Sequence, residues 1–178
     1  PVKFDWSNMK DSYDGTVTDA SANAVAQLMH YCGKGCQMAY GLGASSGSSP
    51  CAMKALLNYF DYDHNIRFVP RCGNYGDWID LYYSNEEWDN LIYMELAERR
   101  PVFMVGGSSS EGHAFVCDGY DGDGMFHINW GWGGGSNCYC LLNTMVPQGV
   151  TEGFNFGPEI IIGIQPPTNL PFNFASTV

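Results

Sequence analysis

Residues 112–134 read GHAFVCDGYDGDGMFHINWGWGG, and this stretch decides the fold and the chemistry that we expect. Two apolar runs flank the glycine- and aspartate-rich segment 120–124, a pattern typical of a β-hairpin. Closing the hairpin brings His113, at the start of the first run, beside Asn129 and Trp130 at the end of the second. A catalytic histidine needs such a place, with one ring nitrogen free and a neighbour that orients the ring. We therefore expect acyl transfer of the cysteine type, with the position of the cysteine still to be found.

The composition is that of a folded domain. The chain has 178 residues, of which 45% are hydrophobic and only 15% are charged. The net charge of −11 disfavours binding to nucleic acid and to anionic membranes, which require Lys and Arg. No apolar run reaches the roughly 20 residues of a transmembrane helix. Because the chain begins at Pro1 and has no signal-peptide pattern, we expect a processed product or a fragment.

Seven cysteines are an odd number for a disulfide scaffold. Their closest spacings, Cys32-x3-Cys36 and Cys138-x-Cys140, do not form the paired sets of a structural zinc site, so we expect no metal. Most are expected to be small buried side chains, with room for one or two disulfides if the chain is exported.

The hydrophobic periodicity predicts an α+β chain. A short strand is expected over 2–6, a helix over 19–32 that Gly33 ends, and a strand over 36–40. A glycine- and serine-rich loop covers 41–49. Further helices are expected from Ser49 and from the capping box at Ser84–Glu87 to before Pro101. Strands are predicted at 65–70, 101–106, 113–119, 125–131, 138–142 and 159–164. Short turns between the later strands favour an antiparallel sheet or partial barrel.

Three segments resemble the streptopain-type cysteine peptidases, a bacterial papain-like family. They are GHAFVCDG with HINWGWGG, MAYGLGASSGSSPCAMKALLNYFDY, and WDNLIYMELAERRPVFMVGG. The match keeps its order from about Val2 to Gln165. The resemblance implies a papain-like fold, of which this chain supplies mainly the antiparallel sheet or barrel subdomain with packed helices. Residues 1–165 would be the second part of the catalytic domain, and 166–178 a C-terminal tail.

The nucleophile is where the chain departs from this family. The family's cysteine lies near the N-terminus of the catalytic domain, in a Gly-Cys-Val-Ala-like segment that this sequence lacks. Residues 19–29, DASANAVAQLM, resemble a later helix of the family and contain no cysteine. The resemblance therefore implies a partner, an upstream piece of the catalytic domain that carries the nucleophile and the oxyanion-stabilising glutamine.

The resemblance also implies roles for individual residues. His113 would be the base, and Trp130 would lie beside its imidazole, a role that asparagine has in papain. Asn129 stands at the papain-like spacing and is the second choice. The substrate would contact positions in the serine loop and around the hairpin: Gly43, Ala44, Ser45, Gly112 and Trp132.

The expected function is that of a cysteine endopeptidase. The resemblance implies a polypeptide substrate bound in an extended form, with an apolar side chain preferred in the pocket, and no cofactor. It also allows a propeptide inhibitor as a partner. It places the protein outside a bacterial cell or on its surface, where such peptidases serve virulence.

Each assignment has a simpler structural alternative. A lone histidine is usually a satisfied core residue, but Gly112 beside His113 and the NWGWGG segment that follows favour the catalytic interpretation. We interpret the other histidines, His30, His64 and His127, in structural or surface roles. Two other functions stay open. One is an inactive homologue that binds peptides. The other is an enzyme that uses Cys51, which lies in the first turn of a helix, where the helix dipole lowers a thiol pKa.

Overall fold

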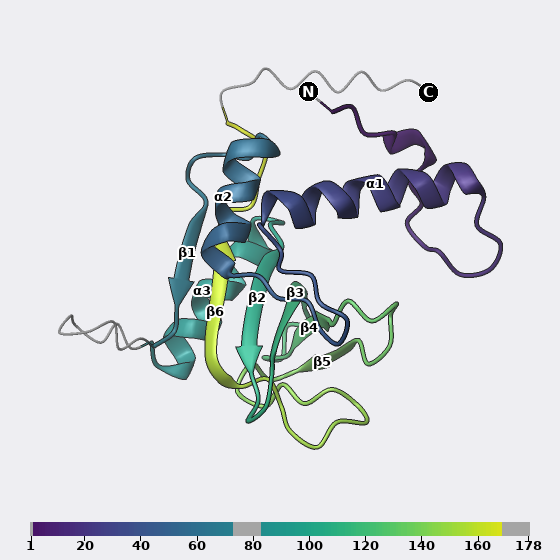
Figure 1. The fold of residues 1–178 in the computed structure, drawn as a ribbon. Coiled ribbons are helices and arrows are strands. Elements are labelled where there is room, and N and C mark those ends of the chain that lie inside the picture. The colour runs from purple at the N-terminus through teal and green to yellow at the C-terminus, as the bar shows by residue number, and fades with distance from the viewer. Residues whose placement is uncertain (1, 73–82, 169–178) are drawn as a thin grey trace. The chain divides into compact units, whose positions relative to one another are not determined.

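The structure is a computed structural model that describes residues 2–72 and 83–168. The chain divides into two compact units, Pro1–Tyr59 and Phe60–Val178, which are described one at a time. The first unit is helical and the second holds all the strands of the sheet, so the predicted α+β class is confirmed (Figure 1).

The first unit is built on two helices, α1 (Asp19–Gly35) and α2 (Ser49–Tyr59). Thr18 caps α1 by accepting a hydrogen bond from the Ser21 N–H at 3.2 Å. The prediction that Gly33 ends α1 was wrong, because this glycine makes room for a neighbour instead. A Cβ at Gly33 would lie 1.8 Å from the Tyr40 hydroxyl oxygen.

The predicted strand over 2–6 was also wrong. Residues Trp6–Asn8 form a short 3-10 helix, η1. The Asp5 carboxylate accepts hydrogen bonds from Ser7 Oγ and Asn8 Nδ2, both at 2.7 Å, and these local bonds compete with strand pairing. The strand expected over 36–40 is reduced to a single bridge between Ala39 and Ser46.

Helix α1 has the predicted helical periodicity, but much of its apolar stripe is exposed. Met29 is 68% exposed. Ala22, Ala26 and Cys32 are exposed as well, whereas Ser21, Ala24 and Gly33 are buried. Periodicity identifies an apolar stripe but not the surface that covers it.

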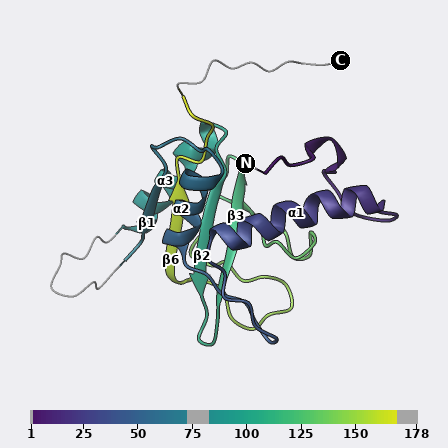
Figure 2. The ribbon, with the colours of Figure 1, turned by 45° about the horizontal axis from the view of Figure 1, so that its top comes forward.

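The second unit is a six-stranded antiparallel sheet in the order β1-β6-β2-β3-β4-β5. Its strands are β1 (Arg67–Pro70), β2 (Val102–Gly107), β3 (Gly112–Tyr120), β4 (Phe126–Asn129), β5 (Cys138–Cys140) and β6 (Phe156–Ile162). β6, β2 and β3 run side by side in the turned view (Figure 2). The hairpin predicted from 112–134 is β3–β4, with Cys117 opposite Ile128.

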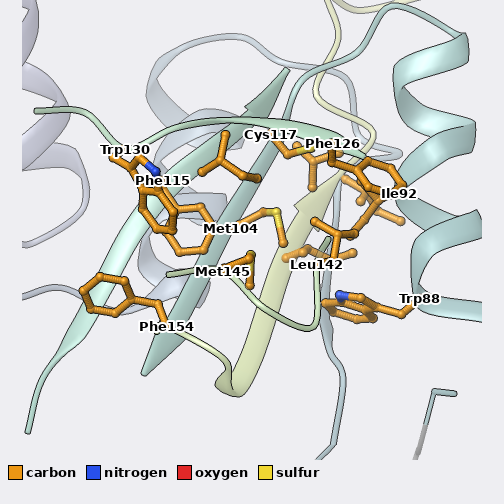
Figure 3. Close-up of a cluster of buried hydrophobic side chains, with 14 residues drawn as sticks. Trp88, Ile92, Met104, Phe115, Cys117, Phe126, Trp130, Leu142, Met145 and Phe154 are labelled. Carbon is orange, nitrogen blue, oxygen red and sulfur yellow. The ribbon is translucent and has the colours of Figure 1, made fainter. Parts of the chain in front are cut away.

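One face of the sheet carries the core of this unit. Helix α3 (Asn85–Ala97) contributes Trp88 and Ile92 to one buried cluster that also holds the strand residues Met104 and Phe115 (Figure 3). Trp88 and Trp130 are both fully buried in this cluster. The sheet therefore places the end of the hairpin, and the histidine that faces it, on the rim of a packed core.

The capping box predicted at Ser84 is confirmed. Ser84 Oγ accepts from the Glu87 N–H at 3.2 Å, and the Glu87 carboxylate accepts from the Ser84 N–H at 2.9 Å. We expect Ser84→Ala to lower the free energy of unfolding by about 1 kcal/mol, because the cap satisfies donors that helix geometry leaves unpaired. Denaturant unfolding measures this. Ser12→Ala, at an exposed serine outside any helix, is the control, and an equal loss in both variants would contradict the role of the cap.

The start of the predicted C-terminal tail is pinned. The Asp63 carboxylate accepts from the Thr168 N–H at 2.8 Å and from its hydroxyl at 2.9 Å. Hydrogen bonds from the Asn65 N–H and from Thr168 lower the pKa of Asp63 to about 2. This attachment therefore persists to strongly acidic pH. The rest of the predicted tail, residues 169–178, lies outside the described residues.

Candidate active site

His113 lies on β3 opposite Gly106 of β2, and one of its ring nitrogens has a main-chain partner. His113 Nε2 is 2.8 Å from the carbonyl oxygen of Trp130. Because a carbonyl only accepts, the proton of a neutral imidazole is assigned to Nε2, which leaves the lone pair on Nδ1. The site thus holds the tautomer that an Nδ1 base requires.

Two asparagines shape the turn that presents this carbonyl. Asn137 Oδ1 accepts from the Trp130 N–H at 3.1 Å, and Asn129 Oδ1 accepts from the Gly131 N–H at 3.0 Å. Gly131 turns the chain with a φ of +76°, which suits glycine. Asn129 therefore holds the backbone beside Trp130 instead of bonding the imidazole. No spacing rule marks Asn137 in the sequence, so its part in this turn becomes evident only from the structure.

Four aromatic rings surround the imidazole of His113. The ring centroids of Trp132, Phe154, Phe115 and Trp130 lie 4.7, 5.2, 6.1 and 6.3 Å from it. Trp130 is fully buried while Trp132 is 41% exposed, and their two rings stack at 5.9 Å. The enclosure is therefore closed on the core side, and Trp132 forms its wall toward solvent.

The indole N–H of Trp130 does not follow the usual pattern. A buried indole normally donates to a partner, yet Trp130 Nε1 has none among the described residues. Trp130 therefore contributes its ring surface and its main-chain carbonyl, and not its side-chain N–H.

The aromatic rings around His113 do not include the other three histidines. His127 on β4 pairs through Nδ1 with the Asp118 carboxylate, and its ring lies 5.1 Å from that of Tyr139. His30 and His64 are exposed. Their positions agree with the structural or surface roles predicted for them.

The cysteines are all free, and their predicted burial was largely wrong, because only Cys117 is fully buried. Burial raises the pKa of Cys117 to about 12 and that of Cys140 to about 12. Neither thiol is suited to form a thiolate at neutral pH. Cys51 is in the first turn of α2, in the other unit from His113, and its N–H donates to Ser48 Oγ at 3.4 Å.

The predicted substrate-binding residues divide between the units. Gly112 is the first residue of β3 and precedes His113, and the Trp132 ring lies against the His113 ring. Gly43, Ala44 and Ser45 are exposed in the loop of the first unit.

In 2–72 and 83–168, no three His, Cys, Asp or Glu side chains are grouped as metal ligands. The helices in these ranges are also too short or too polar to cross a membrane.

Comparison with known proteins gives consistent matches. The model of the peptidase C10 family matches residues 2–140. The thiol protease/hemagglutinin PrtT of Porphyromonas gingivalis is 34% identical over 171 residues, which cover 93% of this chain and 19% of PrtT. Streptopain of Streptococcus pyogenes is 32% identical over 169 residues, which cover 92% of this chain and 40% of streptopain.

Solved structures agree with these matches. The active wild-type cysteine protease interpain A of Prevotella intermedia superposes with a TM-score of 0.77 at 31% identity, covering 92% of this chain and 65% of that one. A prointerpain A fragment gives a TM-score of 0.73 at 32% identity, covering 92% of this chain and 48% of that one. The present chain thus spans less than half the length of PrtT and streptopain, and about two thirds of interpain A.

Proposed function

The chain belongs to the peptidase C10 family, and from that premise we propose that it supplies the histidine side of a cysteine endopeptidase. The observation that carries the proposal is the hydrogen bond from His113 Nε2 to the Trp130 carbonyl. It fixes one ring nitrogen and leaves Nδ1 for proton transfer, which is what a cysteine nucleophile requires of its base.

In the proposed reaction, His113 Nδ1 gives and accepts the transferred protons. The paired state is a thiolate with an imidazolium. The sulfur adds to the peptide carbonyl carbon, and Nδ1 gives its proton to the leaving amine as the C–N bond breaks. The acyl group is then bound to the sulfur as a thioester. His113 Nδ1 accepts a proton from water, and the resulting hydroxide adds to the thioester carbonyl carbon. Cleavage of the C–S bond releases the acid and restores the thiolate and imidazolium. The other ring proton stays on Nε2 throughout, donated as a hydrogen bond to the Trp130 carbonyl.

The nucleophile is proposed to lie on an upstream piece of the catalytic domain. The raised thiol pKa values of Cys117 and Cys140 make these two cysteines unsuitable as the nucleophile. Cys51 lies on a helix of the other unit, and it is the alternative nucleophile. On this proposal, residues 1–165 form the second part of the catalytic domain.

The proposed substrate is a polypeptide held in extended form. Gly112, Gly43 and Ala44 would offer main-chain groups to it, as the edge of a sheet does. Ser45 would border the side-chain pocket, and the exposed face of Trp132 would line the cleft. A propeptide that occupies the same cleft is a proposed inhibitor, and the proposed location is outside the cell or on its surface.

The test is peptide hydrolysis by the full-length protein that contains this chain. We expect hydrolysis that iodoacetamide abolishes, and Cys51→Ser is expected to leave kcat/KM within about twofold of the wild type. A folded Cys51→Ser protein without activity would place the nucleophile on this chain. A full-length protein that binds peptides but turns over none would identify an inactive binding homologue.

A further inference from the structure

Phe154 faces His113 from a segment that the proposed function does not use. Its ring centroid lies 5.2 Å from that of His113 and 5.8 Å from that of Trp130, and the residue is only 3% exposed. Figure 3 shows Phe154 on the same side of the core as Trp130 and Phe115. It comes from the loop before β6, far along the chain from the hairpin. Phe154 thus closes the enclosure of the imidazole from a separate part of the fold.

Space for this approach is provided by Gly106, the cross-strand partner of His113. A Cβ at Gly106 would lie 2.0 Å from the Phe154 carbonyl oxygen and 2.9 Å from its carbonyl carbon. Both of these are main-chain atoms, so a side chain at Gly106 would displace the backbone that carries Phe154.

The segment that carries Phe154 is tied down on both sides. The Phe154 N–H donates to the Met145 carbonyl at 2.9 Å, and the Met145 N–H donates to Asn155 Oδ1 at 2.7 Å. Glu152 accepts from the Ser109 N–H at 3.0 Å, which joins this segment to the turn between β2 and β3. Phe154 is therefore held in place as the strands are, and is not a mobile loop residue.

We propose that Phe154 is a positioning residue for His113, an inference that rests on the proposed function. One hydrogen bond, from Nε2 to the Trp130 carbonyl, fixes a point on the imidazole but not the plane of the ring. Packing against Phe154, at an interplanar angle of 40°, and against Trp132, at 35°, fixes that plane and with it the direction of Nδ1. Proton transfer depends steeply on that direction, since small misplacements of reacting groups cost large factors in rate.

The test compares Phe154→Leu with Phe126→Leu in the full-length protein. Both phenylalanines are buried in the same core, at 3% and 2% exposure, but only Phe154 contacts the His113 ring. We expect Phe154→Leu to lower kcat about tenfold with KM within about twofold, and Phe126→Leu to change neither. Gly106→Ala should reproduce the Phe154→Leu result, because it displaces the Phe154 backbone.

A second readout does not depend on turnover. Nitrogen-15 NMR of the labelled histidines is expected to show a single state of the His113 ring, with Nε2 protonated and donating to the Trp130 carbonyl, in the wild type and in Phe126→Leu. Phe154→Leu should shift or broaden these signals. If the wild type is inactive but the signals shift as expected, the proposed function fails and the positioning role stands. If the wild type is active and the two leucine variants behave alike in both measurements, the positioning role is overturned.

Discussion

His113→Ala is expected to lower kcat/KM for peptide hydrolysis by about 10⁴-fold, at the upper end of the range for loss of a general acid–base. The substitution removes the proton acceptor and also the cation that holds the thiolate, so two contributions are lost at once. His113 is half-buried on the rim of the core, and folding should survive. The measurement is steady-state hydrolysis by the full-length protein, with circular dichroism to confirm the fold.

His127→Ala is the matched control for this prediction. His127 lies on the other strand of the same hairpin and bonds the Asp118 carboxylate, away from the aromatic enclosure. Its loss should leave kcat/KM within about threefold, as is usual for a substitution remote from the chemistry. A folded His113→Ala protein that keeps most of its activity would contradict the role of His113 as the base.

Local patterns were sufficient to predict the elements of the sheet unit and the start of the site. The hairpin of 112–134 and the capping box at Ser84 both arise from residues close in sequence, and both are confirmed. The end of α1 was missed because Gly33 is required by Tyr40, a contact that no periodicity reports. Its apolar stripe was identified, but the burial of such a stripe depends on a covering surface that sequence spacing does not specify.

The chemistry of the site was predicted only in part, for a similar reason. The motif predicted Trp130 and Asn129 as neighbours of the imidazole, with a side chain of one of them orienting the histidine. The structure uses a main-chain carbonyl, placed by the turn that Asn129 and Asn137 hold. Phe154 reaches the ring through the packing of a loop over Gly106, so its role depends on tertiary structure and leaves no local pattern.

Trp130→Ala separates the two contributions of that residue, its buried ring and its carbonyl. Trp130 is fully buried among Phe115, Trp132 and Phe154, so truncation should lower the free energy of unfolding by about 3–5 kcal/mol. The carbonyl that accepts from His113 belongs to the main chain and survives the substitution. The loss in kcat, measured well below the unfolding transition, should therefore be smaller than that of His113→Ala.

Trp88→Ala is the control for this prediction, because Trp88 is another fully buried indole in the same core. It should cost a similar free energy of unfolding, since the deleted ring and its burial are the same, and leave the kcat of the folded protein unchanged. If Trp130→Ala stays folded and yet loses as much rate as His113→Ala, the indole ring itself orients the imidazole. In that event the carbonyl bond would be insufficient, and the ring would have the role that asparagine has in papain.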